Sequence, residues 1–215
     1  MTDLALHNYF RSSTSVRVRA ALNLKGLSFD YIPLSLLKGE QASADHLALN
    51  PSGLVPTLVT PHGPLPQSLA IIEWLDEVYP EPALLPADPW GRARVRSLAH
   101  IVALDIHPVN NLRILKHLEA KYGVDAEGKA QWFRKWASAG LAALEQRLTA
   151  DPETGAFCHG DKVGLADLCL YAQVLNNVRF DVDMTSYPTL RRIHANCMEI
   201  PALQDAIPAN QPDAV

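Results

Sequence analysis

The stretch Arg11-Ser12-Ser13-Thr14-Ser15-Val16-Arg17-Val18-Arg19 follows a short apolar run and opens a run of helical composition that ends at Gly26. Hydroxyl side chains at a helix start accept hydrogen bonds from its first N–H groups, and one serine is enough for that. Further hydroxyl groups beside an arginine gather donors at the positive end of the helix, which favours an anion such as a phosphate, a carboxylate or a thiolate. A hydroxyl-rich cap with a solvated arginine fits this stretch equally well.

The composition of the 215 residues is that of a soluble globular protein, with 48% hydrophobic and 20% charged residues. A formal net charge of -4 gives no basic excess, so nucleic acid is not an expected partner. No apolar run reaches the length of a membrane span, and the first residues lack the basic segment of a signal peptide. Cys158, Cys169 and Cys197 are odd in number and widely spaced, so we expect a reduced, cytoplasmic protein without a disulfide framework or a metal site.

Short strands and helices alternate in the first part of the chain. Leu4–Tyr9 predicts a strand, Val16–Lys25 a helix and Phe29–Leu34 a second strand. Two further short strands flank the turn Pro61-His62-Gly63, and an amphipathic helix runs from Gln67 to Tyr79. This order predicts a small mixed sheet with helices packed on it.

The second part of the chain begins after Pro80, Pro82, Pro86 and Pro89, where strand signals end. Its expected helices are Arg92–Tyr122 with a kink at Pro108, Ala126–Leu148, the apolar run Gly164–Asn177, and Pro188–Glu199. We therefore expect an α+β domain over residues 1–82 and an all-helical domain over residues 88–215.

Four motifs occur in an order and spacing that carry a resemblance. They are Ser12-Ser13-Thr14-Ser15 with Arg17 and Arg19, Asn50-Pro51 with Val55-Pro56, Gln67-Ser68, and Asp105-Ile106-His107-Pro108 with Asn110-Asn111. Together they resemble the cytosolic glutathione transferases, and among these the zeta class, whose members are maleylacetoacetate and maleylpyruvate isomerases. The resemblance covers nearly the whole chain. It implies a thioredoxin-like glutathione-binding domain, an all-helical substrate-binding domain, and a homodimer.

The resemblance implies where the cofactor glutathione binds the first domain. A cis peptide at Val55–Pro56 would turn the Val55 backbone outward to pair with the cysteinyl backbone of glutathione. Gln67 and Ser68 would hold the γ-glutamyl carboxylate, because a helix N-terminus favours an anion. For Ser68 alone, a simple capping role is equally compatible with the sequence.

The same resemblance places the hydroxyl cluster beside the glutathione sulfur. Donors and a helix N-terminus lower a thiol pKa by stabilising the thiolate, so we expect Ser12 to be the principal donor, assisted by Ser13 and Thr14. Thr14 stands where zeta members carry cysteine, which excludes a covalent role for that cysteine. Gly53 stands where many relatives have glutamine, which removes a side chain expected to touch glutathione.

Arginines are expected to recognise the substrate, because maleylacetoacetate and maleylpyruvate carry two carboxylates and arginine binds planar carboxylates in a bidentate manner. The resemblance implies this role for Arg11, Arg113 and Arg179. For Arg17 and Arg19 we expect solvated positions or an ion pair between the domains.

His107 is expected to contact glutathione or substrate together with Asn111. Its spacing from His100 puts the two histidines on one helical face, but no third ligand has suitable spacing for a metal.

The function implied by the resemblance is glutathione-dependent cis–trans isomerisation of maleylacetoacetate or maleylpyruvate to the fumaryl isomer, in tyrosine or other aromatic catabolism. One alternative is a broader glutathione transferase that conjugates or dehalogenates small electrophiles, which needs the thiolate but not the arginines. Another is a non-catalytic binding module with the same fold, against which Ser12, Val55-Pro56 and Gln67-Ser68 argue.

Overall fold

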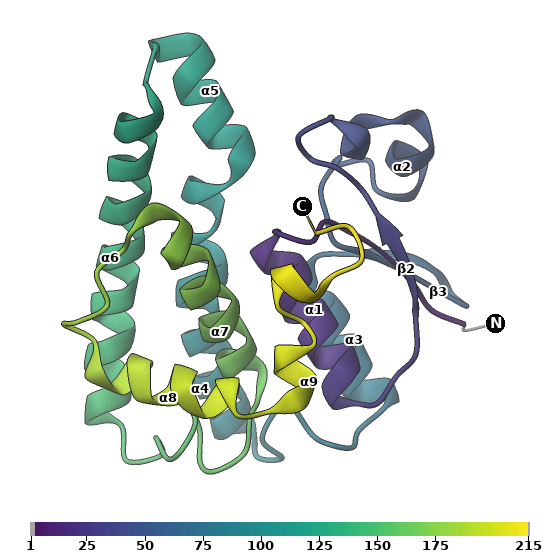
Figure 1. The fold of residues 1–215 in the computed structure, drawn as a ribbon. Coiled ribbons are helices and arrows are strands. Elements are labelled where there is room, and N and C mark those ends of the chain that lie inside the picture. The colour runs from purple at the N-terminus through teal and green to yellow at the C-terminus, as the bar shows by residue number, and fades with distance from the viewer. Residues whose placement is uncertain (1–2, 215) are drawn as a thin grey trace. The chain divides into compact units, whose positions relative to one another are not determined.

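The computed structural model describes residues 3–214 (Figure 1). Within this range the chain forms two compact units. The first contains residues 3–84 and 198–214, and the second contains Leu85–Cys197.

The first unit is built on a four-stranded mixed sheet with the order β2-β1-β3-β4. Its strands are β1 (Ala5–Asn8), β2 (Asp30–Pro33), β3 (Thr57–Thr60) and β4 (Gly63–Pro66). β1 runs parallel to β2 and antiparallel to β3, and β3 pairs antiparallel with β4. Leu6 lies opposite both Tyr31 and Leu58, and Leu6 and Leu58 are fully buried core residues. The expected mixed sheet is therefore confirmed.

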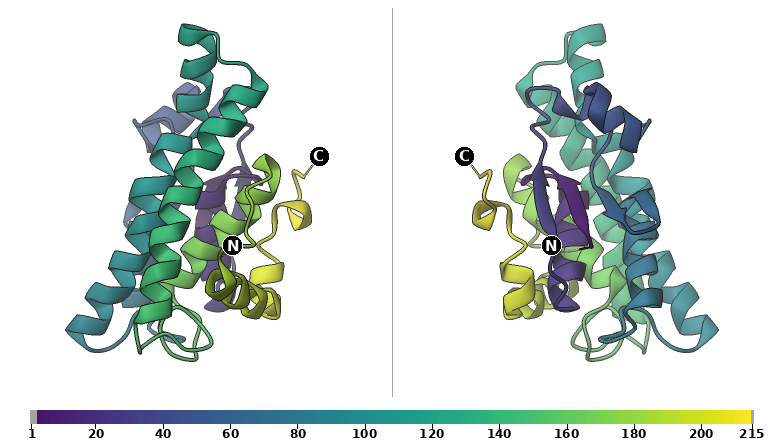
Figure 2. Two further views of the ribbon diagram at one scale, coloured as in Figure 1. Left: turned by 90° about the vertical axis from the view of Figure 1, so that its left-hand side faces the viewer. Right: turned by 90° about the vertical axis from the view of Figure 1, so that its right-hand side faces the viewer.

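Helices complete the first unit. They are α1 (Ser13–Leu24), the short 3₁₀ turn η1 (Glu40–Ala42), α2 (Ala44–Leu49), α3 (Ser68–Val78), α9 (Pro201–Gln204) and the 3₁₀ turn η5 (Pro208–Asn210). α1 begins after Ser12, whose Oγ accepts a hydrogen bond from the Ser15 N–H, and it is followed by Gly26 at φ 63°. It packs against α3 and α9, and Figures 1 and 2 show α9 beside it.

The second unit is helical. Its elements are α4 (Pro89–His100), η2 (Ile101–Ile106), η3 (Pro108–Asn110), α5 (Leu112–Tyr122), α6 (Ala126–Ala150), α7 (Leu165–Asn177), η4 (Val178–Phe180) and α8 (Pro188–Met198). α7 is buried along most of its length, as its apolar sequence predicts. In the described part of the chain, no helix combines the length and the apolarity needed to cross a membrane.

The single kinked helix expected over Arg92–Tyr122 is divided in the structure. α4 continues into η2, a π-helical segment, and a 3₁₀ turn at Pro108 then separates it from α5. Pro108 supplies no backbone N–H, which explains the break there. The π-helical segment has no counterpart in the periodicity, and it packs against Gly140 of α6, where any Cβ would overlap Ile106.

The compact units divide the chain differently from the expected domains at its C-terminal end. Residues 198–214 group with the first unit rather than with the helical domain. Asn23 Nδ2 donates to the Ala202 carbonyl at 3.0 Å, Arg19 Nη2 donates to the Ala206 carbonyl at 3.0 Å, and Tyr31 donates to Asp213. Bonds of this kind to main-chain carbonyls leave no pattern in the sequence, so the expectation could not include them.

Candidate functional site

The hydroxyl cluster lies at the start of α1. Ser12 Oγ lies 2.8 Å from Thr14 Oγ1, and Thr14 Oγ1 donates to the Val55 carbonyl at 3.1 Å. Because Thr14 has one hydroxyl proton and gives it to Val55, Ser12 is the donor in the Ser12–Thr14 contact. Ser12 and Thr14 are half-buried, whereas Ser13 and Ser15 are buried. Rotation about the Ser12 Cβ–Oγ bond can redirect its proton to another acceptor without moving the backbone.

The Val55 segment is held from two sides. The Val55–Pro56 peptide is cis, as expected. The Leu54 carbonyl, which shares a peptide plane with the Val55 N–H, lies 2.9 Å from His46 Nε2 and accepts from Asn50 Nδ2 at 2.9 Å. With the Thr14 bond to the Val55 carbonyl, these contacts fix the main-chain groups on either side of Val55.

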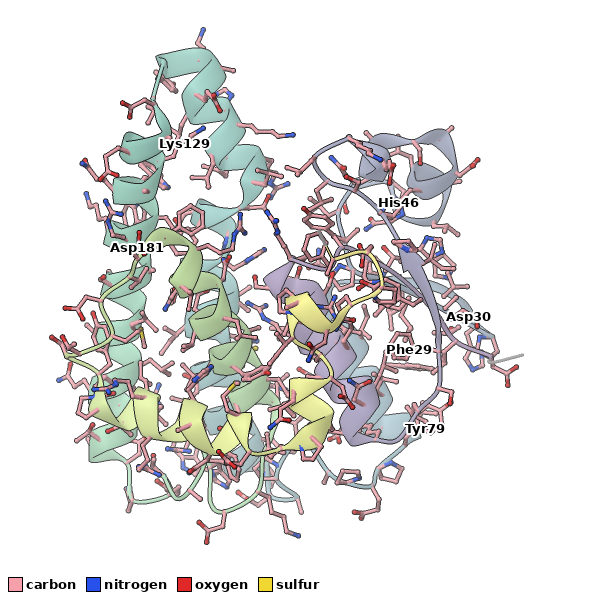
Figure 3. All side chains as sticks on the ribbon, viewed as in Figure 1. Phe29, Asp30, His46, Tyr79, Lys129 and Asp181 are labelled. Atoms are coloured by element: carbon pink, nitrogen blue, oxygen red, sulfur yellow. The ribbon has the colours of Figure 1, made fainter. Side chains whose placement is uncertain are left out.

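His46, labelled in Figure 3, was not identified from the sequence. It lies on α2 and is buried, and its Nδ1 finds no hydrogen-bond partner among residues 3–214. Since Nε2 lies 2.9 Å from a carbonyl oxygen, which can only accept, Nε2 carries a proton and donates it to the Leu54 carbonyl. A histidine in the apolar helix directly before Asn50-Pro51 was the available signal.

The second motif of the first unit is the start of α3. Gln67 precedes the helix with φ 75° and ψ 110°, a left-handed backbone that is rare for a residue other than glycine. No side chain among the described residues caps the helix, and its first residue, Ser68, is buried. The free N–H groups of this first turn can therefore receive an anion.

Arg17 and Arg19 are buried, so the expectation of solvated positions is wrong for both. The reason is that α1 is enclosed on all sides, with Val16, Val18 and Leu22 buried as well. Arg19 donates to Asn8 Oδ1 at 2.7 Å and to the Phe10 carbonyl at 2.9 Å, and these bonds hold the backbone that leads to Ser12. Arg17 Nη1 donates to Ser68 Oγ at 3.4 Å.

The second unit brings three of the expected residues together at the start of α5. Asn111 caps the helix by accepting from the Arg113 N–H at 3.1 Å. Its Nδ2 lies 3.3 Å from His107 Nε2, while Arg113 is exposed. His107 and Asn111 thus act as one polar pair next to an arginine.

Arg179 lies on η4 and is exposed. Its Nη1 donates to Asn176 Oδ1 at 3.3 Å, and its guanidinium lies 5.4 Å from the centre of the Phe180 ring. Phe180 stacks on Phe133 with ring centres 3.9 Å apart, and its carbonyl accepts from Arg134 at 3.1 Å. These contacts from α6 fix the short segment that carries Arg179.

Arg11, the remaining expected residue, belongs to the first unit. It is half-buried, and its guanidinium lies 5.0 Å from the centre of the Phe10 ring. Within that unit the structure joins Ser12, Thr14 and Val55 in one set of contacts, and Arg17 and Ser68 in another.

Comparison with known proteins gives matches in both units. Residues 11–78 match the family model described as glutathione S-transferase, N-terminal domain, and residues 114–207 match the glutathione S-transferase, C-terminal domain. The chain is 49% identical to the maleylpyruvate isomerase of a Ralstonia species over 98% of its own length and 100% of that protein. It is 48% identical to a probable maleylacetoacetate isomerase of Vibrio cholerae over 100% of both chains.

Solved structures agree with these matches. The holo structure of a maleylpyruvate isomerase, described as a bacterial zeta-class glutathione S-transferase, has a TM-score of 0.96 at 49% identity and covers 98% of this chain and 100% of that one. A maleylacetoacetate isomerase of Methylobacterium extorquens with bound malonate and glutathione has a TM-score of 0.95 at 41% identity, covering 98% and 99%. The chain belongs to the glutathione S-transferase family, and within it to the zeta class.

Proposed function

We propose that the chain is a glutathione-dependent isomerase that converts maleylacetoacetate or maleylpyruvate to its fumaryl isomer. The observation that carries the proposal is the contact of Ser12, Thr14 and Val55. It joins hydroxyl donors at the positive end of α1 to the main-chain edge that would receive the cysteinyl part of glutathione. The relatives named above carry the same activity in their names.

The residues of the first unit fit glutathione chemically. Val55 is half-buried and would offer its main chain to the peptide, and α3 begins with a turn that has no side-chain cap among the described residues and suits a carboxylate. When bound, glutathione supplies a thiolate that adds to the cis double bond beside the ketone and later leaves, so that this bond can rotate in between. The rotating Ser12 hydroxyl stabilises the thiolate, because a donor hydrogen bond lowers a thiol pKa from its ordinary value of about 8.5. Thr14 holds the Ser12 hydroxyl in place through their 2.8 Å contact, and Ser13 is assigned an assisting role beside it.

The arginines provide positive charge for a substrate with two carboxylates. We assign Arg11, Arg113 and Arg179 to this role, with His107 and Asn111 contacting glutathione. Arginine suits both the carboxylates and the negative charge that develops on the ketone oxygen. A homodimer, a cytoplasmic location and a place in tyrosine breakdown also belong to this proposal.

The test is to follow the loss of maleylpyruvate and maleylacetoacetate absorbance with and without glutathione. The wild type should convert one or both diacids only when glutathione is present, and the glutathione concentration should stay constant. Arg179→Ala should lower kcat/KM by about 10- to 100-fold, the equivalent of one charge-assisted contact. Arg191→Ala, which removes an exposed arginine of α8, is the matched control and should leave kcat/KM unchanged.

A halogenated electrophile separates the isomerase from a general transferase. If the diacids are inert while this compound is conjugated and glutathione is consumed, the chain is a general transferase. If neither reaction occurs and glutathione does not bind, the proposal fails.

A further inference from the structure

Arg17 is a buried cation whose hydrogen-bonding capacity is largely unused. Its side chain is only 1% exposed, and the one hydrogen bond that this side chain makes to the described residues goes from Nη1 to Ser68 Oγ at 3.4 Å. Nε and Nη2 are buried without a hydrogen-bond partner among residues 3–214. In that part of the chain Arg17 is also in no ion pair. A guanidinium has five N–H donors, so most of them remain unsatisfied.

The surroundings of Arg17 do not balance its positive charge, and they add further positive potential. Ser68, which Arg17 contacts, is the first residue of α3 and is only 6% exposed. The first turn of α3 has no side-chain cap among the described residues, so its N–H groups present the positive end of the helix dipole. An unpaired buried charge is strongly destabilising, and a second positive feature beside it raises that cost. Both features become favourable when an anion lies between them.

Ser68 connects the buried cation to a ligand. Its Oγ accepts the Arg17 N–H, so its own hydroxyl proton remains for another acceptor. A carboxylate at the start of α3 can therefore accept from the Ser68 hydroxyl and from the main-chain N–H groups while it faces the charge of Arg17. Such charge-assisted hydrogen bonds are about twice as strong as neutral ones.

We propose that Arg17 is the buried counter-charge of a carboxylate that binds at the N-terminus of α3, and that it acts through Ser68 as a positioning residue. The inference rests on the proposed function, under which this carboxylate is the α-carboxylate of the γ-glutamyl residue of glutathione. It assigns the glutathione affinity in part to a side chain that is not exposed to the ligand.

Removing the charge then changes stability and affinity in opposite directions. Without ligand, Arg17→Met deletes an unpaired buried charge and keeps an apolar stem, so the melting temperature should rise by about 2–4 °C. The affinity for glutathione should fall by about 10- to 100-fold, the equivalent of one charge-assisted contact. A side chain with a purely structural role would lower both.

The experiment measures dissociation constants by titration calorimetry for three tripeptides. Glutathione is compared with glutaryl-Cys-Gly, which keeps the carboxylate and lacks the ammonium group, and with 4-aminobutyryl-Cys-Gly, which lacks only the carboxylate. The proteins are the wild type, Arg17→Met, Arg17→Lys, and Arg191→Met as a matched control on the exposed face of α8.

Arg17→Met should weaken the binding of glutathione and of glutaryl-Cys-Gly by the same factor. It should leave the affinity for 4-aminobutyryl-Cys-Gly unchanged. Arg17→Lys keeps the charge and should retain the preference for peptides with the carboxylate, which tests the inference even if Arg17→Met does not fold. Arg191→Met should match the wild type throughout.

Two results would overturn the inference and leave the proposed function standing. In one, Arg17→Met binds glutathione as the wild type does. In the other, Arg17→Met weakens the binding of all three peptides equally and lowers the melting temperature. A wild-type protein that binds no glutathione would contradict both the inference and the proposed function.

Discussion

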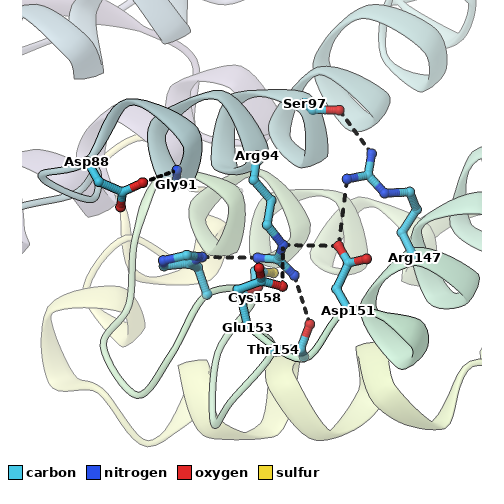
Figure 4. Close-up of polar contacts among 10 residues, drawn as sticks. Asp88, Gly91, Arg94, Ser97, Arg147, Asp151, Glu153, Thr154 and Cys158 are labelled. Carbon is cyan, nitrogen blue, oxygen red and sulfur yellow. Dashed lines mark hydrogen bonds and ion pairs between the residues drawn. The ribbon is translucent and has the colours of Figure 1, made fainter.

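Each unit buries an arginine in α-helical surroundings, and the two arginines differ in their partners. Arg94 of α4 is 5% exposed, and all of its nitrogens are used (Figure 4). Nε donates to Asp151 at 3.0 Å, Nη1 to the Cys158 carbonyl at 2.8 Å and Nη2 to Thr154 at 2.9 Å. Arg17 of α1 is as deeply buried and has Ser68 as its only hydrogen-bond acceptor among the described residues.

This difference in partners distinguishes the two arginines by role. The charge of Arg94 is structural, whereas the charge of Arg17 is available to a ligand. Arg94 fastens the loop after α6 to α4, and its charge is balanced by Asp151. Nothing in residues 3–214 balances Arg17 in the same way. Burial alone therefore does not identify a functional arginine in this fold, whereas burial without partners points to a binding site.

The largest effect is expected for Arg94→Met, which should lower the free energy of unfolding by about 3 kcal/mol because it leaves buried acceptors unpaired. Chemical denaturation measures this loss. Glutathione affinity of the folded variant should stay at the wild-type value, in contrast to Arg17→Met. Arg92→Met, two residues earlier in α4, removes a single long bond to the Pro86 carbonyl; it is the control and should cost much less. Equal stability losses for Arg94→Met and Arg92→Met would refute the distinction.

Asp167 is a second buried group of the second unit whose hydrogen-bonding atoms all have partners. Its carboxylate accepts from the N–H of Cys158 at 2.8 Å and of Gly164 at 2.9 Å. Asp167→Asn keeps one acceptor and should cost about 1–3 kcal/mol of unfolding free energy.

The pH dependence of this cost gives a further check. Burial raises the pKa of Asp167 from 3.8 to about 6 and outweighs the two N–H bonds. The folded protein therefore binds this proton more tightly than the unfolded chain, and the stability contribution is largest below pH 3.8 and is lost as the pH rises through about 6. Asp167→Asn should thus be more destabilised, relative to wild type, at pH 4 than at pH 7 in parallel melts. A cost that rises with pH would contradict the assignment.

His46 is an intermediate case, because Nε2 of this buried side chain donates to a carbonyl and Nδ1 has no hydrogen-bond partner among the described residues. His46→Phe keeps a planar aromatic ring at this position and removes the bond to the Leu54 carbonyl, worth about 1 kcal/mol. We expect KM for glutathione to rise about fivefold with kcat unchanged. His46→Gln, whose amide can replace the Nε2 donor, should restore KM, and Asp45→Asn on the exposed face of α2 should have no effect. A loss of kcat with KM unchanged would show that His46 does not act through the Val55 main chain.

The smallest change in stability is expected for the hydrogen-bonded pair Tyr31–Asp213, which is partly exposed to solvent. Tyr31 donates to Asp213, and burial together with this bond raises the pKa of the tyrosine hydroxyl. Because the pair is only partly buried, Asp213→Ala should lower the free energy of unfolding by no more than about 1 kcal/mol. A loss as large as that for Arg94→Met would mean that the tail is a major part of the core.

Much of the fold was predictable because local signals and tertiary packing agree. Ser12 starts α1, Gly26 follows its end, and Pro108 interrupts the long helical run, each for a backbone reason visible in the sequence. The prediction that Arg17 and Arg19 are solvated was wrong, because it followed from the charge of arginine and not from the residues around each one. Valine, alanine and leucine on every side of these arginines already indicated a helix that is buried all round.

Other features lie beyond sequence patterns. The π-helical segment Ile101–Ile106 has the same residue types as an α-helix, and its Ile106 lies so close to Gly140 that a Cβ there would overlap it. His46 acts on a carbonyl oxygen, and every residue has one, so the bond has no sequence signature.

The return of residues 198–214 to the first unit has a consequence for synthesis on the ribosome. Residues 3–84 leave the ribosome first, yet the carbonyls of Ala202 and Ala206 that complete the bonding of Asn23 and Arg19 are made only after the whole second unit. At about 5–20 residues per second, the nascent first unit must wait for several seconds or more before these two hydrogen bonds to the C-terminal segment can form. A nascent-chain protease assay should therefore find it sensitive until the last helix and the segment after it have emerged.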